Sequence, residues 1–366
     1  MVTELVEVEQ EIVSRSKTMK EQEINSLLRE NIKSIKPYSS ARDEYKDASA
    51  DMVFIDANEN PFQTSVNRYP DPQQTLVKER LADIKGVKAS QILLGNGSDE
   101  ILDLIFRAFC EPNSDNVITL PPTYGMYSVL ANLNAVDIIS IELDKNFEPK
   151  VADILNIQNS NSKLLLLCSP NNPTANSFNA DKLEELINGF NGIVVIDEAY
   201  IDFSNAESWL NRLDEFPNLI VTQTLSKAYG LAGIRLGICY ASEFIISILN
   251  TIKPPYNVNQ LTQSKALERL NNIEEVNAQI NMILKERNKL ISKLESIAFI
   301  NTVYASDANF VLAKVDDANL RYNQLIEKGI VVRNRTTQPL CENCLRFTVG
   351  TKLENEQLIN TLKLLE

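Results

Sequence analysis

The chain has 366 residues, of which 44% are hydrophobic and 23% are charged, so it is long enough to form two domains around a large core. Its formal net charge of −13 argues against a nucleic-acid partner, because it offers no basic field to displace counterions from phosphates. It contains no histidine, which excludes Ser-His-Asp and Cys-His catalysis and histidine-ligated zinc. Proton transfer must therefore fall to lysine, tyrosine or carboxylates.

Apolar runs and cysteines indicate the compartment. No run of about 20 apolar residues occurs, and the N-terminus is charged from Glu4 onward without an apolar signal segment. The five cysteines are odd in number, which favours free thiols in a reducing compartment over a disulfide framework. Cys341 and Cys344 form a lone CxxC, for which a turn is favoured over a metal or redox site, and no metal is expected. We expect a cytoplasmic protein with no membrane or nucleic-acid partner.

The first 50 residues are expected to form an N-terminal extension and arm that packs with the smaller domain. Residues 1–18 are polar and only weakly periodic. The segment Ile24–Ile32 has the spacing of a short amphipathic helix. Lys36-Pro37 would end it, because the residue before a proline is disfavoured in the helical conformation.

Residues 51–252 alternate between strand-like and helix-like segments. The expected helices are Gln73–Lys85, Ser98–Cys110, Thr123–Asn134 and Ala180–Phe190, and the expected strands are Gln91–Leu94, Asn116–Leu120, Val136–Leu143, Lys163–Cys168, Ile193–Ile196, Leu219–Thr222 and Leu236–Tyr240. This alternation predicts a large α/β domain with a mostly parallel sheet and helices on both faces. Such a sheet binds ligands outside the carboxyl ends of its strands.

The pattern changes towards the C-terminus, where residues 253–366 are expected to form a smaller α+β domain. Helical periodicity dominates from Glu243 to about Leu294, and the proline pair in Lys253–Tyr256 predicts an interdomain linker. The further expected elements are strands Asn309–Val315, Ile330–Arg333 and Leu345–Val349 and helices Ala318–Lys328 and Asn355–Leu365.

The stretch Gly192–Gly237 carries the strongest functional signal. An apolar run typical of a buried parallel strand ends at Asp197, and a second apolar strand precedes Lys227. Arg235 follows the lysine in the same stretch. These three groups at neighbouring strand ends suit a charged aromatic cofactor, and pyridoxal phosphate (PLP) fits them. The lysine would bind its aldehyde, the carboxylate its ring nitrogen and the arginine its phosphate.

These residues and several further motifs resemble the fold-type-I, class-II PLP-dependent aminotransferases, and most closely the histidinol-phosphate aminotransferase family. The motifs follow the family's order and cover the chain from about Ile35 to its end: DANENP (Asp56–Pro61), NRYPD (Asn67–Asp71), PPTYGMYSV (Pro121–Val129), CSPNNPT (Cys168–Thr174), TLSKAYGLAGIRLG (Thr224–Gly237) and CLRFTVGT (Cys344–Thr351). The resemblance implies PLP as cofactor, and histidinol phosphate and glutamate or 2-oxoglutarate as substrates. It also implies a homodimer with a shared active site, in which Tyr69 reaches the neighbouring subunit's cofactor phosphate.

Several residues are expected to bind the cofactor. The turn before Ser98 and the free N–H groups of the helix that begins there can bind an anion, and in the family such a loop acts with a serine and an arginine, here Ser226 and Arg235. Asn172 and Tyr200 are expected to hydrogen-bond the phenolate oxygen. The cofactor-binding set is Ser98, Asp99, Tyr124, Asn172, Asp197, Tyr200, Thr224, Ser226, Lys227, Arg235 and Tyr69; Tyr124 would stack on the ring, and Lys227, Asp197 and Tyr200 would be catalytic.

The resemblance further implies a substrate-binding site. Arg333 and Arg346 lie on expected strands of the smaller domain, and a guanidinium matches a carboxylate or a phosphate. With Tyr38 they would bind the anionic end of the substrate. Asn58 and Glu59 would line its other side.

One position departs from the family's pattern, and two alternatives for the function stay open. The family's NNPT turn usually ends in glycine, whereas Ala175 follows here and would be mildly strained if φ is positive. An aromatic amino acid aminotransferase or a threonine-phosphate decarboxylase would use the same lysine and aspartate. A DNA-binding regulator is disfavoured, because the first 50 residues are too short and not basic.

Overall fold

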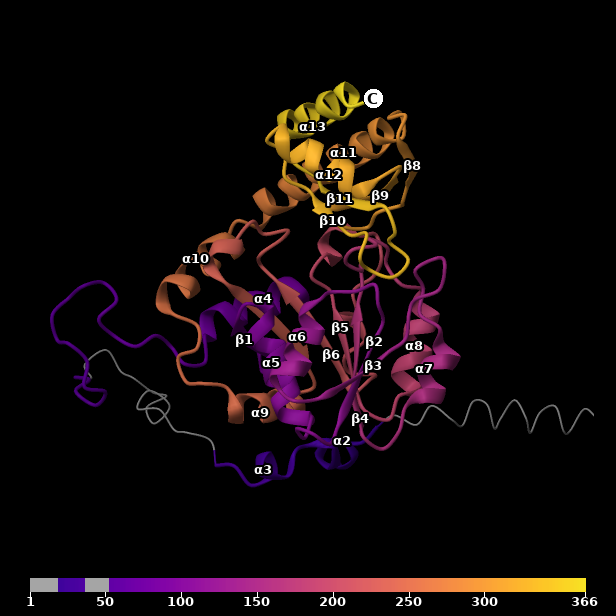
Figure 1. The fold of residues 1–366 in the computed structure, drawn as a ribbon. Helices are drawn as coiled ribbons and strands as arrows, with labels where there is room; N and C mark the ends of the chain where they lie inside the picture. The colour runs from indigo at the N-terminus through magenta and orange to yellow at the C-terminus, as the bar shows by residue number, and fades with distance from the viewer. Residues whose placement is uncertain (1–18, 37–52) are drawn as a thin grey trace, which may run out of the picture.

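A seven-stranded sheet lies at the centre of the larger part of the molecule in the computed structural model, which describes residues 19–36 and 53–366 (Figure 1). Its strand order is β1-β7-β6-β5-β4-β2-β3. The strands are Ile92–Asn96 (β1), Asn116–Thr119 (β2), Asp137–Ser140 (β3), Ser162–Cys168 (β4), Ile193–Asp197 (β5), Leu219–Thr224 (β6) and Leu236–Ala241 (β7).

Six of these strands point in the same direction. β3, β2, β4, β5 and β6 pair in parallel, whereas β7 is antiparallel to both of its neighbours, β6 and β1. β1 therefore has the same direction as the parallel strands, and the carboxyl ends of all strands except β7 share one edge. The predicted α/β fold with a mostly parallel sheet is confirmed.

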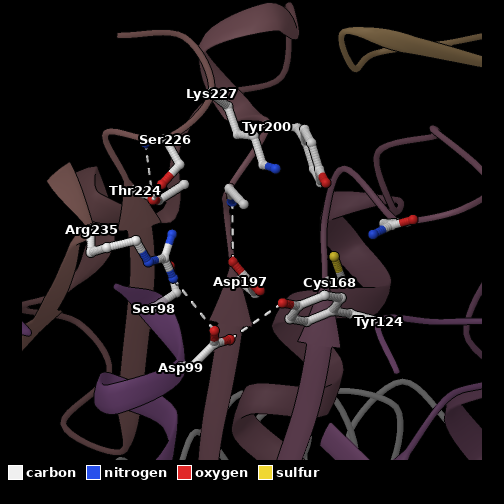
Figure 2. Close-up of a pocket in the computed structure, with 12 residues that line it drawn as sticks. Ser98, Asp99, Tyr124, Cys168, Asp197, Tyr200, Thr224, Ser226, Lys227 and Arg235 are labelled. Carbon is white, nitrogen blue, oxygen red and sulfur yellow. Dashed lines mark hydrogen bonds and ion pairs between the residues drawn. The ribbon is translucent and has the colours of Figure 1, made fainter. Parts of the chain in front are cut away.

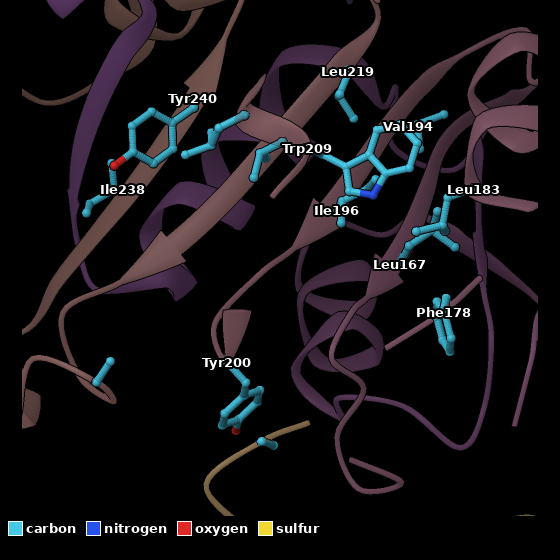
Figure 3. Packing of buried hydrophobic residues seen from close by; sticks show 14 of the residues in the cluster. Leu167, Phe178, Leu183, Val194, Ile196, Tyr200, Trp209, Leu219, Ile238 and Tyr240 are labelled. Carbon is cyan, nitrogen blue, oxygen red and sulfur yellow. The ribbon is translucent and has the colours of Figure 1, made fainter. Parts of the chain in front are cut away.

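Helices cover both faces of the large sheet. α4 (Thr75–Lys85), α7 (Val151–Ile157), α8 (Ala180–Gly189) and α10 (Gln260–Leu270) join one hydrophobic cluster, and α2 (Glu21–Leu27), α5 (Ser98–Phe109), α6 (Met126–Leu133) and α9 (Glu243–Ile252) join the other. Along β4, Leu165 and Leu167 join the first cluster, part of which is shown in Figure 3, while Leu164 and Leu166 join the second. Strand side chains alternate between faces, so a continuous apolar run is what a sheet covered on both faces requires.

The C-terminal part forms a four-stranded antiparallel sheet of order β10-β11-β9-β8. Its elements are Ile273–Leu294 (α11), Ile300–Val303 (β8), Phe310–Val315 (β9), Ala318–Glu327 (α12), Arg333–Asn334 (β10), Cys344–Thr348 (β11) and Lys352–Leu364 (α13). Along β9, Val311 and Ala313 pack in a cluster with the helices of this part, whereas Phe310 and Leu312 join the first cluster of the large sheet. One face of the small sheet therefore packs towards the large one.

The N-terminal helix is broken, so the prediction of one helix over Ile24–Ile32 is wrong. α2 ends at Leu27, and the short helix Glu30–Lys33 (α3) begins after two residues with extended backbone. The amide of Arg29 donates to the carbonyl of Ala108 at 3.1 Å, and Leu28 is buried in the cluster that contains α5. These tertiary contacts override the local helical periodicity.

The helix α7 and the strand β8 are absent from the prediction. α7 has seven residues, of which only Ile154 is buried, and β8 is a four-residue edge strand without a fully buried residue. Neither has enough buried positions to show a clear period. α6 also begins at Met126, later than the predicted Thr123.

The division of the chain into residues 1–50, 51–252 and 253–366 stays a prediction. α2 packs on the large sheet through Ile24. α10 follows the proline pair yet packs against α4, and the long α11 continues to the small sheet, where it packs against α13.

Candidate active site

Parallel strands end side by side at the carboxyl edge of the large sheet. Cys168, the last residue of β4, lies opposite Asp197, the last residue of β5, and Asp197 lies opposite Thr222 near the end of β6. β1 ends at the same edge, where α5 begins at Ser98. The segment that follows β6 carries Lys227. The topology therefore gathers residues from four separate motifs at one place.

One pocket contains all the predicted cofactor-binding residues except Tyr69. Figure 2 shows Lys227 and Tyr200 facing the pocket near Asp197, with Arg235 and Ser98 to one side. The residues that line the pocket are Ser98, Asp99, Tyr124, Cys168, Asn172, Asp197, Ala199, Tyr200, Thr224, Ser226, Lys227 and Arg235.

Asp197 is a buried carboxylate with which Lys227 interacts electrostatically. Its side chain accepts hydrogen bonds from the Tyr127 hydroxyl at 3.2 Å and the Ala199 amide at 3.1 Å. It forms no ion pair within the part of the chain that the structure describes. Burial raises its pKa to about 6, against the lowering effect of these donors. A protonated ring nitrogen would supply a positive charge for an ion pair with this carboxylate.

Lys227 has an amine that burial makes easier to deprotonate. Burial lowers its pKa, and the nearby positive charge of Arg346 lowers it further. Its Nζ lies 5.7 Å from the centre of the Tyr200 ring. A lysine with a lowered pKa is a better nucleophile near neutral pH than an ordinary surface lysine.

A close approach between two chain segments builds an anion cradle. Gly97 has φ of +82° just before α5, and a Cβ there would lie 2.5 Å from the Nη2 of Arg235. A Cβ on Gly237 would lie 2.4 Å from the amide nitrogen of Ser98. Only glycine fits at either position, so the N-terminus of α5 and the guanidinium meet. The free N–H groups and the positive end of the helix dipole suit a phosphate.

Hydroxyl groups and an aromatic ring complete this end of the pocket. The hydroxyl of Thr224 donates to the hydroxyl of Ser226 at 3.0 Å and accepts from its amide at 3.1 Å. The hydroxyl of Tyr124 donates to Asp99 at 3.3 Å, and the other carboxylate oxygen of Asp99 lies 3.6 Å from Arg235. The ring of Tyr124 is thereby held at the wall of the pocket.

Arg346 connects the small sheet to this pocket. It lies on β11 and donates a short hydrogen bond to the side chain of Asn172. Its guanidinium carbon lies 4.9 Å from the centre of the Phe310 ring, which in turn packs edge-on against Tyr200. Arg333 lies directly opposite Arg346 in the antiparallel pairing of β10 and β11. Both predicted arginines therefore stand at the junction of the two sheets.

These features fit PLP. The pocket combines a phosphate cradle, a lysine amine with a lowered pKa and a buried carboxylate without an ion pair among the described residues. Each of the three matches one reactive or charged group of that cofactor.

The model of the family described as aminotransferase class I and II matches residues 42–362. The chain belongs to this family. A relative, the histidinol-phosphate aminotransferase of Flavobacterium johnsoniae, is 64% identical over 344 residues, which are 94% of this chain and 99% of the relative. The histidinol-phosphate aminotransferase of Clostridium acetobutylicum shares the fold with a TM-score of 0.76 and 24% identity, over 82% of this chain and 91% of that chain. That of Sinorhizobium meliloti, solved in complex with pyridoxal-5'-phosphate, has a TM-score of 0.76 and 22% identity, over 82% and 83%.

The family and fold class predicted from the motifs are thus confirmed, while the roles of single residues in this aminotransferase stay predictions. Tyr69 is half exposed outside the pocket and stacks on Tyr256 with ring centres 4.5 Å apart. Glu59 forms an ion pair with Arg68 at 2.6 Å and accepts from the Tyr69 amide at 2.7 Å. Neither it nor its neighbour Asn58 lines the pocket. The predicted substrate residue Tyr38 lies outside the described residues.

Sequence reasoning missed some groups of the aminotransferase site. Tyr127 is fully buried in α6 and contacts Asp197, but helical periodicity makes it look like a core residue. Phe310 supports both Arg346 and Tyr200 from the start of a strand. Arg335 directly follows β10, and the turn-like sequence around it gave no sign that its side chain lies near the site. A third arginine close to two predicted ones is the signal that could have revealed it.

The alanine that replaces the family's usual glycine after the NNPT turn has a left-handed backbone in the structure. Ala175 has φ of +70°, as the sequence comparison with the NNPT turn anticipates for a strained position. Left-handed backbone costs an alanine roughly 1 kcal/mol. Its amide donates to Asn171 at 2.7 Å and its carbonyl accepts from Asp307 at 2.7 Å, so tertiary hydrogen bonds hold the conformation.

Proposed function

We propose that this protein is a PLP-dependent histidinol-phosphate aminotransferase of histidine biosynthesis. It transfers the amino group of L-histidinol phosphate to 2-oxoglutarate and yields imidazole acetol phosphate and glutamate. The observation that carries the proposal is the pocket shared by Lys227, Asp197 and Arg235, with Arg346 contacting its wall at Asn172. The 64% identical relative, matched over nearly its whole length, bears the name of this activity.

Different residues of the pocket would bind different groups of the cofactor. Arg235, Ser226 and the N-terminus of α5 hold its phosphate, and Asp197 keeps the proton on its ring nitrogen. Tyr200 and Asn172, which also line the pocket, would hydrogen-bond its phenolate oxygen. PLP supplies an electron sink for the electron pair left when a substrate C–H bond breaks.

Lys227 moves the proton in this reaction. With PLP bound, its Nζ would accept the proton from the substrate carbon that bears the nitrogen and would carry it to the cofactor side. The lowered pKa leaves more of the amine in the neutral form that accepts a proton. The substrate is oriented for this transfer by its anionic end, which Arg333 and Arg346 bind.

A product assay separates the proposed reaction from its alternatives. Purified protein with PLP, L-histidinol phosphate and 2-oxoglutarate should form glutamate and imidazole acetol phosphate. The same protein should release no carbon dioxide from threonine phosphate, and its kcat/KM for phenylalanine should be lower than that for histidinol phosphate. Carbon dioxide release without glutamate formation would favour the decarboxylase, and a preference for phenylalanine would favour the aromatic aminotransferase.

We infer that the active unit is a homodimer with shared sites. Several apolar side chains near Tyr69 in the sequence are exposed: Val53, Ile55, Phe62 and Leu76 are all between 64% and 90% exposed. A cluster of exposed apolar residues is typical of a protein interface. A second copy covering the segment that carries Tyr69 would bring this tyrosine to the partner's cofactor.

An experiment that mixes two inactive variants tests whether each active site contains residues of both subunits. Lys227→Ala and Tyr69→Ala proteins should each be impaired, and co-refolding them should restore up to about a quarter of the wild-type activity, because each mixed dimer has one intact site. Co-refolding either variant with itself is the control. No gain on mixing would mean that Tyr69 serves its own subunit or none.

The location in the cell forms part of the same proposal. None of the described helices is both long and apolar enough to cross a membrane. We propose a cytoplasmic enzyme on the basis of the biosynthetic reaction.

A further inference from the structure

Three arginines lie on one face of the small sheet. Arg333 of β10 pairs with Arg346 of β11, and the next pair in register joins Asn334 with Leu345. The amide of Arg335 donates to the carbonyl of Cys344 at 2.8 Å, so the ladder continues by one residue beyond β10. Because side chains alternate between faces, Arg335 lies on the same face as Arg333 and Arg346.

This face looks towards the large sheet. Leu345 and Phe347 of β11 pack in the cluster of the small sheet and its helices, whereas Cys344 joins the first cluster of the large sheet. Arg346 alternates with Leu345 and Phe347, and its contact with Asn172 shows which way it points. Arg335 therefore projects from the small sheet towards the pocket.

Within residues 19–36 and 53–366, none of the three guanidinium groups forms an ion pair with a carboxylate. Among the described residues, the Nε atoms of Arg335 and Arg346 are buried without a hydrogen-bond acceptor. Burial lowers the pKa of Arg346 to about 10, and the adjacent Arg335 and Arg333 contribute to this shift. Burial and Arg333 also lower the pKa of Arg335. In a chain of net charge −13, such clustered positive charge favours the binding of an anion.

We propose that Arg335 is a specificity-determining residue that completes a three-arginine site for the phosphate dianion of the substrate. The proposal deepens the proposed function and rests on it. A phosphate monoester carries up to two negative charges at neutral pH and offers three acceptor oxygens, whereas a carboxylate carries one charge and offers two. Two arginines suffice for a carboxylate. The third guanidinium matches the additional charge and the additional oxygen of the phosphate.

The location of Arg335 explains how one site can accept both substrates. Arg346 is held by Asn172 and the Phe310 ring, so it is preorganised for either anion. Arg335 has no such partner within the described residues and interacts electrostatically with Tyr200 at the pocket wall. It therefore contributes most when the bound group is doubly charged, and little when glutamate or 2-oxoglutarate is bound.

The test compares a substrate that carries a phosphate with substrates that lack it. With the holoenzyme, Arg335→Gln should lower kcat/KM for histidinol phosphate by roughly 10- to 100-fold, as expected for one lost charge-assisted hydrogen bond. The loss for histidinol, which lacks the phosphate, and for glutamate should stay below about threefold, since Arg333 and Arg346 remain. Arg335→Lys, which keeps the charge without the planar fork, should recover part of the loss. Arg107→Gln removes one exposed positive charge from α5 and is the matched control.

Two outcomes would overturn the role of Arg335. One is an equal loss with all three substrates, which would indicate a structural effect. The other is an unchanged kcat/KM for histidinol phosphate. Failure of the wild-type enzyme to use histidinol phosphate would instead contradict the proposed function. In that event, competitive inhibition by methyl phosphate, measured with whichever amino donor is active, still tests the site: the inhibition constant should rise at least tenfold in Arg335→Gln, and an unchanged constant would reject it.

Discussion

Replacement of Lys227 by alanine should lower the rate of transamination by roughly 10,000-fold, the upper range for losing a positioned proton carrier. Two functions are lost together, because the same amine binds the aldehyde of PLP and moves the substrate proton. Its neighbours cannot replace it: Tyr200 has a pKa that burial raises, so its hydroxyl is a poor base at neutral pH.

Steady-state glutamate formation and the visible absorbance of bound PLP are the two measurements for this variant. The absorbance should shift to that of PLP not attached to a lysine, while the phosphate cradle at Arg235 still retains the cofactor. Lys88→Ala is the control, because Lys88 is an exposed lysine that pairs with Glu243 at 3.1 Å. A Lys227→Ala enzyme with more than a tenth of the wild-type rate would refute the assignment.

Replacement of Asp197 by asparagine should lower kcat by roughly 100- to 1,000-fold, the loss typical of removing one preorganised electrostatic partner of a transition state. Asparagine keeps the shape and can accept from Tyr127, but it has no charge to hold a proton on the ring nitrogen. Asp202→Asn, which removes the carboxylate that pairs with Lys85 at 3.1 Å, controls for loss of a partly buried negative charge. Equal rates for Asp197→Asn and wild type would show that the ring nitrogen does not depend on this carboxylate.

Although Asp197→Asn should lower kcat, the same substitution should make the cofactor-free protein more stable than the wild type near neutral pH. The folded-state pKa of Asp197 is raised from 3.8 to about 6, so the folded protein binds more protons than the unfolded chain between these values. The free energy of unfolding of the wild type should therefore fall relative to that of Asp197→Asn as pH rises from about 4 to about 6, by on the order of 3 kcal/mol. Urea unfolding of both proteins without PLP measures this difference. A difference that does not change with pH would mean that the carboxylate is ionised at little cost in the empty pocket.

The elements around the site were the most predictable part of the fold. β4 and β5 appear in the sequence as continuous apolar runs because helices bury both faces of the sheet. The reversed direction of β7 could not be predicted, because an apolar run of the same composition forms either a parallel or an antiparallel strand. The break between α2 and α3 could not be predicted either, since it depends on a contact with Ala108, far away in the sequence.

In the candidate site, too, residues placed by local sequence could be predicted, whereas residues placed by tertiary contacts could not. Asp197 and Lys227 were accessible to sequence reasoning because each follows an apolar strand. Tyr127 and Arg335 were not, because their positions depend on helix packing and on the continuation of a ladder beyond β10. The burial that raises the pKa of Asp197 likewise arises only when the sheet is complete.

Borohydride reduction followed by peptide mass mapping tests whether PLP is bound covalently at Lys227, close to Asp197. The holoenzyme should carry one phosphopyridoxyl group per subunit, on the peptide that contains residue 227, and histidinol phosphate added before the reductant should abolish the label. A label on a different lysine, or no label in an enzyme that forms glutamate at the wild-type rate, would contradict the account.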